Sequence, residues 1–84
     1  MDDIDDLCDA ITRVIPHDHC IVAVVRAGQY ANAAIFIARD RIVHEDKAEF
    51  LIRRIYDLAI ENEAWRHAAF IEKRHPFVRE PRRE

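Results

Sequence analysis

Apolar residues near the start of the chain recur with the three-and-four spacing of an amphipathic helix. They are Ile4, Leu7, Cys8, Ile11, Val14 and Ile15. Asp2 or Asp3 is available as an N-cap, and Pro16 cannot sit inside a helix because it lacks an amide hydrogen. The spacing therefore predicts a first helix that ends before Pro16.

The next two apolar segments favour β-strands. Residues 20–26 contain the run Ile-Val-Ala-Val-Val, and the single glycine of the chain follows in Ala27-Gly28-Gln29. Residues 30–39 supply a second strand, which is apolar on both faces because Ala31, Ala33, Ile35 and Ile37 alternate with Ala34, Phe36 and Ala38. Asp40-Arg41 permit a turn into a short third strand at residues 42–44. The pattern predicts an antiparallel hairpin followed by a short strand.

A second helix is expected from Asp46, which has the spacing of a capping box with Glu49. Its apolar stripe is Ala48, Leu51, Ile52, Ile55, Leu58 and Ala59, and Trp65, Ala69 and Phe70 continue it. An unbroken helix over residues 47–74 would be about 42 Å long, whereas a compact domain of this size is roughly 30 Å across. Either the helix breaks at residues 61–63 and folds back, or it projects toward a partner.

Together these segments predict one α/β domain of the α+β kind. Its order is helix, strand, strand, short third strand, helix and a further helical segment, with a small antiparallel sheet packed against the helices. The domain covers residues 1–75, and residues 76–84 form a basic C-terminal tail that contains Pro76 and Pro81. A chain of 84 residues can build one modest hydrophobic core.

Composition narrows the function classes. Half of the residues are hydrophobic and 35% are charged, as in folded globular domains. The longest apolar run is too short to span a bilayer, and the acidic start of the chain does not resemble a secretory signal, so a cytoplasmic location is expected. In that compartment Cys8 and Cys20 are expected to stay thiols unless the fold brings them together. The net charge of −3 argues against direct nucleic-acid binding, although residues 1–9 hold five Asp while residues 73–84 hold five bases.

The first candidate contact surface is an acidic face of the first helix. Asp2, Asp5, Asp6 and Asp9 fall at i, i+3, i+4 and i+7 and therefore line one side. Carboxylates one helical turn apart are spaced about as far as successive phosphates of a nucleic-acid strand, roughly 5 to 6 Å. The row therefore indicates a DNA mimic that competes for basic grooves. The alternative is a solvated face whose acids interact favourably with the helix dipole.

The second candidate is apolar surface outside the main stripe of the second helix, formed by Phe50, Tyr56 and Ile60. A helix that is apolar on more than one side is normally covered by something. The covering is either the rest of this chain or a partner, for which a homodimer is the simplest form.

The third candidate is the segment His17-Asp18-His19-Cys20. It lacks the paired spacing of a structural zinc site, so a solvated turn is expected and no metal. If a metal did bind, His17, His19 and Cys20 would be the ligands. No enzyme activity and no cofactor are expected, because the chain has no serine, a single glycine and no motif that activates a cysteine.

The order of the elements resembles double-stranded-RNA-binding domains, but their basic second-helix start is replaced here by His44-Glu45-Asp46-Lys47-Ala48-Glu49. In size, acidity and absence of catalytic motifs the chain resembles the small inhibitors of phages and mobile elements, including anti-CRISPR proteins. The resemblance implies a protein that binds a CRISPR-Cas complex in the host cytoplasm and blocks DNA recognition, with the acidic helix as first contact and Tyr56 and Ile60 next. The alternative is a host regulatory or assembly module that dimerises.

Overall fold

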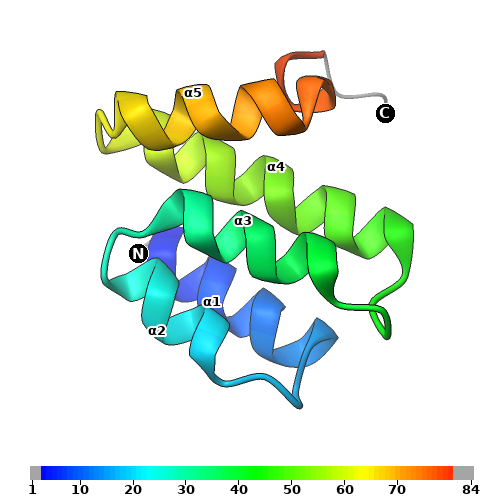
Figure 1. Ribbon diagram of the computed structural model, residues 1–84. Coiled ribbons are helices and arrows are strands. Elements are labelled where there is room, and N and C mark those ends of the chain that lie inside the picture. The colour runs from blue at the N-terminus through cyan, green and yellow to red at the C-terminus, as the bar shows by residue number, and fades with distance from the viewer. Residues whose placement is uncertain (1–2, 81–84) are drawn as a thin grey trace.

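The computed structural model describes residues 3–80, and these form helices joined by short turns (Figure 1). The elements are α1 (Asp3–Val14), α2 (Cys20–Arg26), α3 (Tyr30–Arg39), α4 (Glu45–Glu61), α5 (Trp65–Arg74) and the 3-10 helix η1 (Pro76–Arg79). No strand occurs within this described part of the chain. The prediction of an α/β fold with an antiparallel sheet is therefore wrong, although the first helix is confirmed.

The two segments expected to pair as strands are α2 and α3. In α3 the buried residues are Tyr30, Ala33, Ala34 and Ile37, which follow the helical spacing i, i+3, i+4 and i+7. In α2 the buried residues Ile21 and Val25 lie one helical turn apart. Both segments also fit buried strands, because they are almost continuously apolar, but alanine is the strongest helix former and is common in α3. The expected third strand, residues 42–44, is loop before α4.

Gly28 ends α2 instead of turning a hairpin. Its φ is +79°, in the left-handed region that glycine enters without steric cost. The Gly28 amide donates to the Val25 carbonyl, and the Gln29 amide donates to the Val24 carbonyl, both at 3.0 Å. This pair of bonds is the Schellman motif of a helix C-terminus. A lone glycine fits a hairpin and a helix end equally well, which explains the error.

The long helical segment over residues 47–74 breaks near residues 61–63 and folds back, which confirms the first of the two predicted alternatives and not a helix that projects toward a partner. After Glu61, the Glu63 amide donates to the Ile60 carbonyl and the Ala64 amide to the Ala59 carbonyl, at 3.1 and 2.8 Å. Glu63 has a φ of 57° and occupies the left-handed position of a second Schellman motif. The non-helical turn changes the phase of the helix that follows.

This phase change overturns the expected continuation of the apolar stripe. In α5 the buried residues are Ala68 and Ile71, while Trp65, Ala69 and Phe70 are exposed. The start of α4 also differs from the capping-box prediction. The helix begins at Glu45, and the N-cap is His44, whose Nδ1 accepts a hydrogen bond from the Asp46 amide at 3.2 Å.

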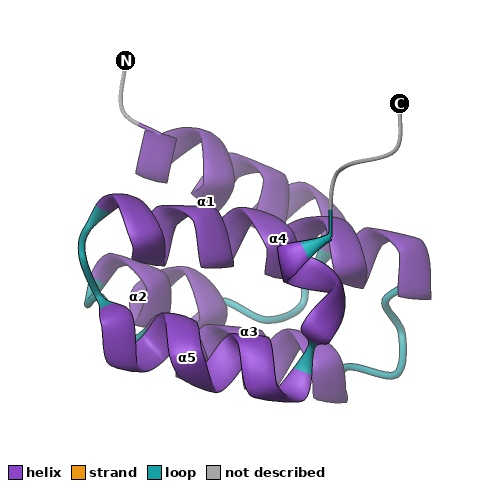
Figure 2. Ribbon diagram, turned by 90° about the horizontal axis from the view of Figure 1, so that it is seen from above, coloured by secondary structure: helices purple, strands orange, loops and turns teal. Residues whose placement is uncertain are grey.

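Helix α4 lies at the centre of the packing, in contact with α1, α3, α5 and η1 (Figure 2). Leu51, Ile55 and Ala59 of α4 are fully buried. Helix α2 packs on α1 and α3, and the whole measures 28 × 24 × 23 Å. Val78 of η1 is also buried in the core. None of the helices described is both long and apolar enough to cross a membrane.

Candidate binding surfaces

The acidic face of α1 is exposed where the structure describes it. Asp5, Asp6 and Asp9 are exposed, and the opposite side of the helix buries Leu7 and Ile11. Asp2, the fourth predicted member, lies outside the described residues. The structure therefore brings three of the four predicted carboxylates together on one solvent-facing side.

Asp5 differs from its two neighbours because it meets a base. The Arg26 guanidinium of α2 donates to Asp5 Oδ1 at 2.9 Å, and both side chains are exposed. Within residues 3–80, no ion pair involves Asp6 or Asp9. An exposed pair of this kind contributes little to stability, because water screens it. It does reduce the negative charge at the α2 side of the row.

Helix α4 carries further exposed acidic residues near the start of α1. It packs beside α1 and runs in the opposite direction (Figure 1), so its C-terminal half lies next to the N-terminal half of α1. That half of α4 carries the exposed carboxylates of Asp57 and Glu61. The acidic groups of the two helices therefore lie at the same end of the α1 and α4 pair.

The three predicted apolar residues of α4 separate in the structure. Phe50 is 50% exposed. Tyr56 and Ile60 are half-buried and pack against the core. Burial raises the pKa of the Tyr56 phenol, and the Glu72 carboxylate of α5, to which it is hydrogen-bonded, raises it further. Much of the apolar excess of α4 is thus covered by this chain's own C-terminal elements.

Other large hydrophobic side chains are exposed, although the sequence pattern predicts them in a strand or in the core. Phe36 is 39% exposed, Ile42 79%, Trp65 58% and Phe70 37%. Their exposure was missed because α3 was assigned as a strand and because the phase of α5 depends on the Glu63 turn. No local signal in the sequence indicated which side of α5 faces the solvent.

Arginine side chains lie over two of the exposed rings. The Arg74 guanidinium carbon is 5.3 Å from the centre of the Phe70 ring on α5, and that of Arg54 is 5.9 Å from the Phe50 ring on α4. Both distances are within the range of cation–π attraction. The two pairs present the same chemistry on different surfaces, which makes one a natural control for the other.

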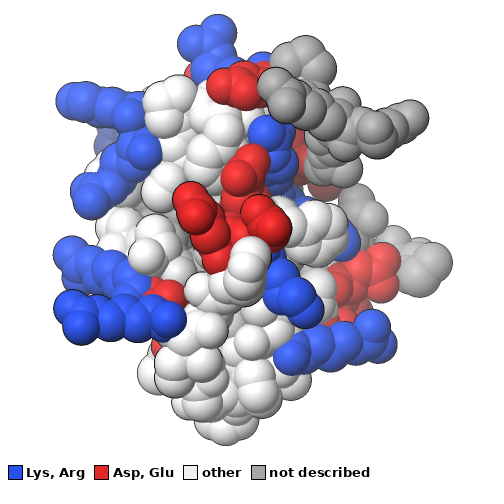
Figure 3. All heavy atoms as spheres, turned by 90° about the vertical axis from the view of Figure 1, so that its right-hand side faces the viewer, with Lys and Arg blue, Asp and Glu red and all other residues white. Residues whose placement is uncertain are grey.

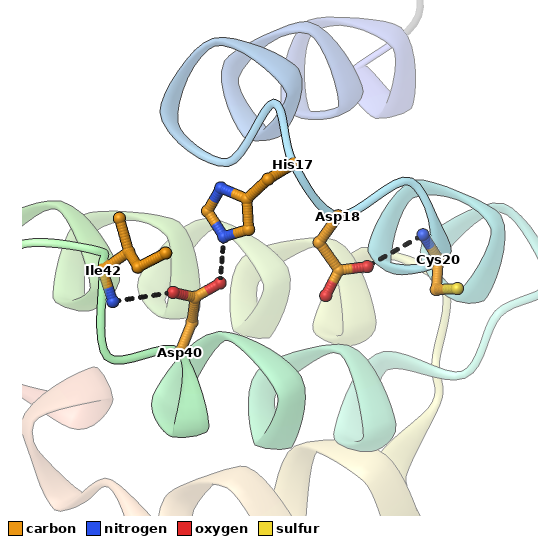
Figure 4. A network of polar contacts seen from close by, with 5 residues as sticks. All are labelled: His17, Asp18, Cys20, Asp40 and Ile42. Atoms are coloured by element: carbon orange, nitrogen blue, oxygen red, sulfur yellow. Dashed lines mark hydrogen bonds and ion pairs between the residues drawn. The ribbon is translucent and has the colours of Figure 1, made fainter.

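The His17-Asp18-His19-Cys20 segment forms a hydrogen-bonded turn (Figure 4). His17 Nε2 lies 2.8 Å from Asp40 Oδ2, and Asp40 Oδ1 accepts from the Ile42 amide at 2.9 Å. The hydrogen bond from His17 is the main cause that lowers the pKa of Asp40. The network ties the turn after α1 to the end of α3.

The same segment does not assemble the predicted metal ligands. Asp18 Oδ1 accepts from the Cys20 amide at 3.0 Å, and the Cys20 sulfur points away from the His17 ring (Figure 4). In the part of the chain that the structure describes, no three His, Cys, Asp or Glu side chains are grouped to hold a metal ion. Cys8 is a buried thiol and Cys20 an exposed one, and they are not bonded to each other.

His67 fills a different structural role, which joins α3 to α5. Its Nδ1 accepts a hydrogen bond from the Ala31 amide at 3.2 Å, and its ring meets the Tyr30 ring edge-on with 6.0 Å between the centroids. The first turn of a helix has amides without helical partners. His67 satisfies one of them and sets the register of α5 against α3.

Comparisons of the chain with protein-family models, with curated proteins and with solved structures found no match.

Proposed function

We propose that the chain is a small, non-catalytic binding protein that occupies a basic, nucleic-acid-binding site of a partner protein. Among such binding proteins, we favour an inhibitor of a CRISPR-Cas complex. The observation that carries the proposal is the exposed row Asp5, Asp6 and Asp9 on α1. Asp57 and Glu61 of the neighbouring helix are exposed carboxylates at the same end of the α1 and α4 pair.

A carboxylate row acts on such a partner by replacing phosphates. Each phosphate contact of a nucleic-acid site contributes electrostatic affinity that falls steeply with salt. An acidic surface that occupies the same basic groups has the same salt dependence, and it prevents the nucleic acid from binding. Asp6 and Asp9 suit this role best, since Asp5 is already paired with Arg26.

The test is inhibition of target-DNA binding by purified CRISPR surveillance complexes, measured by gel mobility with and without the chain. We expect stoichiometric inhibition of at least one complex, weakened by rising salt. The double variant Asp6→Asn, Asp9→Asn should lose the inhibition. The control Glu45→Gln, Asp46→Asn removes the same charge from the start of α4 and should keep it.

Two results would contradict the proposal. If no complex in a panel of different types loses DNA binding, the chain is not an inhibitor of this kind. If the Asp6 and Asp9 variant inhibits as well as the unchanged chain, the acidic face of α1 is not the contact. Circular dichroism of each variant checks that the helices are intact.

A dimeric module is the second candidate, and the exposed Phe50 favours it. In this form the exposed ring of one copy packs against a second copy. The check is the molar mass by light scattering at rising concentration, compared between the unchanged chain and Phe50→Arg. A monomeric mass for both removes this candidate.

A further inference from the structure

We infer that the surface formed by α3 and α5 binds single-stranded nucleic acid. Helices α3 and α5 lie side by side and run in the same direction (Figure 1). Together they carry four basic side chains, Arg39, Arg66, Lys73 and Arg74, and a single acid. This inference goes beyond the proposed function and does not rest on it.

The cations of this surface lack acidic partners. In the described part of the chain no ion pair involves Arg39, Arg66, Lys73 or Arg74. The single acid, Glu72, is hydrogen-bonded to Tyr56 and lies 3.1 Å from Arg79. A group of unpaired cations on two adjacent helices attracts a polyanion.

The negative charge of the protein lies elsewhere. Helices α1 and α4 contain nine acidic and four basic residues. Figure 3 shows acidic side chains gathered at the centre of the view, where α4 begins. Lys and Arg side chains project along the left edge, on the side of α3 and α5, and others lie at the top and lower right. The net charge of −3 therefore hides a basic surface, which is why we depart from the expectation that the chain avoids nucleic acid.

Aromatic rings accompany the cations on the same two helices. Arg66, Phe70 and Lys73 are spaced i, i+4 and i+7, so they form one row on the exposed side of α5. Phe70 also lies one turn beyond His67, on the edge of α5 that contacts α3. Phe36 and Trp65 add exposed rings. Stacking on exposed rings next to Arg is how proteins hold single strands without reading their sequence.

Charge and aromatic content argue against other occupants. A symmetric dimer through this surface would oppose like charges. The acidic face of a second copy's α1 offers Asp side chains without rings, so it would leave Trp65 and Phe70 uncovered. A single strand supplies both one negative charge and one planar base per nucleotide, and so it matches both features.

Trp65 is the only tryptophan of the chain and begins α5, one residue before Arg66, so its fluorescence reports on binding to α5. The probe is a deoxythymidine oligonucleotide of about 16 nucleotides, the upper end of known site sizes. We expect saturable quenching of Trp65. With four phosphate contacts at a slope of about 0.7 each, raising the salt from about 50 to about 200 mM should weaken binding about 50-fold.

Matched variants identify the contacts. Lys73→Gln with Arg74→Gln should weaken binding and reduce the salt slope by about 1.4, the share of two contacts. Arg13→Gln with Lys47→Gln makes the same charge change on α1 and α4 and should have little effect. Phe70→Leu should weaken binding at least about fivefold through lost stacking, whereas Phe50→Leu, from the other Arg and Phe pair, should not.

Several results would overturn the inference. The first is that the oligonucleotide does not quench Trp65 fluorescence. The second is that polyglutamate, or vesicles rich in anionic phospholipid, bind the protein more tightly than the oligonucleotide does. Equal loss in the two charge variants would also overturn it, since the attraction would then be general and not a property of α3 and α5. The assay contains no CRISPR complex, so its outcome is separate from that of the inhibition test.

Discussion

Replacing Glu63 by glycine should stabilise the protein. Glu63 holds the left-handed position of the Schellman motif between α4 and α5, with a φ of 57°. This conformation costs an ordinary L-residue about 1–2 kcal/mol. Glycine avoids the cost but loses about 0.5–1 kcal/mol more backbone entropy on folding. The exposed Glu63 side chain contributes little packing that would be lost.

The net expectation for Glu63→Gly is a gain of about 0.5–1 kcal/mol in the free energy of unfolding. For a domain of this size that corresponds to a rise in Tm of about 2–8 °C. Thermal unfolding followed by circular dichroism at 222 nm, together with urea titration, measures both quantities. The helix signal at low temperature should not change, because the turn is already formed.

Two controls separate this effect from a general effect of glycine. Glu61→Gly acts in the last turn of α4 and should destabilise by about 1 kcal/mol, the usual cost in a helix. Gly28→Ala should also destabilise by about 1 kcal/mol, because alanine is strained at the left-handed φ of +79°. The added Cβ meets no atom within 4 Å, so no steric clash adds to this cost. A Tm for Glu63→Gly at or below that of the unchanged chain would refute the left-handed turn and the fold-back of α5.

Three other predictions concern the core, the loop network and the thiols. Ile55→Ala should cost about 2–5 kcal/mol in urea unfolding, since Ile55 is fully buried, and a loss below about 1 kcal/mol would contradict the central place of α4. Asp40→Asn should lower Tm above pH 3.8, the ordinary pKa of this carboxyl, because the His17 hydrogen bond lowers the folded-state pKa and stabilises the folded protein there. The difference should vanish as the pH falls through the lowered pKa, and a difference that persists in strong acid would refute the linkage. Iodoacetamide should label the exposed Cys20 of the native protein but not Cys8, whose pKa burial raises, as mass spectrometry of peptides can show.

The spacing of apolar residues was sufficient to predict the elements whose sequence fits only the helical period. In α1, Leu7, Cys8 and Ile11 follow helical spacing and are buried as predicted. The apolar stripe of α4 is likewise confirmed through Leu51, Ile55 and Ala59. The exposed carboxylate row on α1 could be predicted for the same reason, because the phase of a correctly assigned helix determines which residues face the solvent.

Residues 20–39 could not be assigned in this way, because their apolar residues fit a period of 2 and a period of 3.6 equally. The choice depends on what the segment packs against. Helix α3 buries Ala33 and Ile37 in a core to which α4 contributes most, and α2 buries Ile21 and Val25 with them. A helical stripe buries these residues together, whereas a strand would divide the apolar residues between two faces.

The protein surface also has features that the sequence predicts and features that only the tertiary structure determines. The sequence alone determined the net charge of −3 and the acidic start of the chain, where residues 1–9 hold five Asp. Only the tertiary structure decided that Trp65 and Phe70 face the solvent, since the turn at Glu63 sets the phase of α5. It also decided that the cations of α3 and α5 lie on neighbouring helices, whereas most of the carboxylates lie on α1 and α4. Net charge is a sum over the chain, but the field that a partner meets depends on distances, and packing sets those distances.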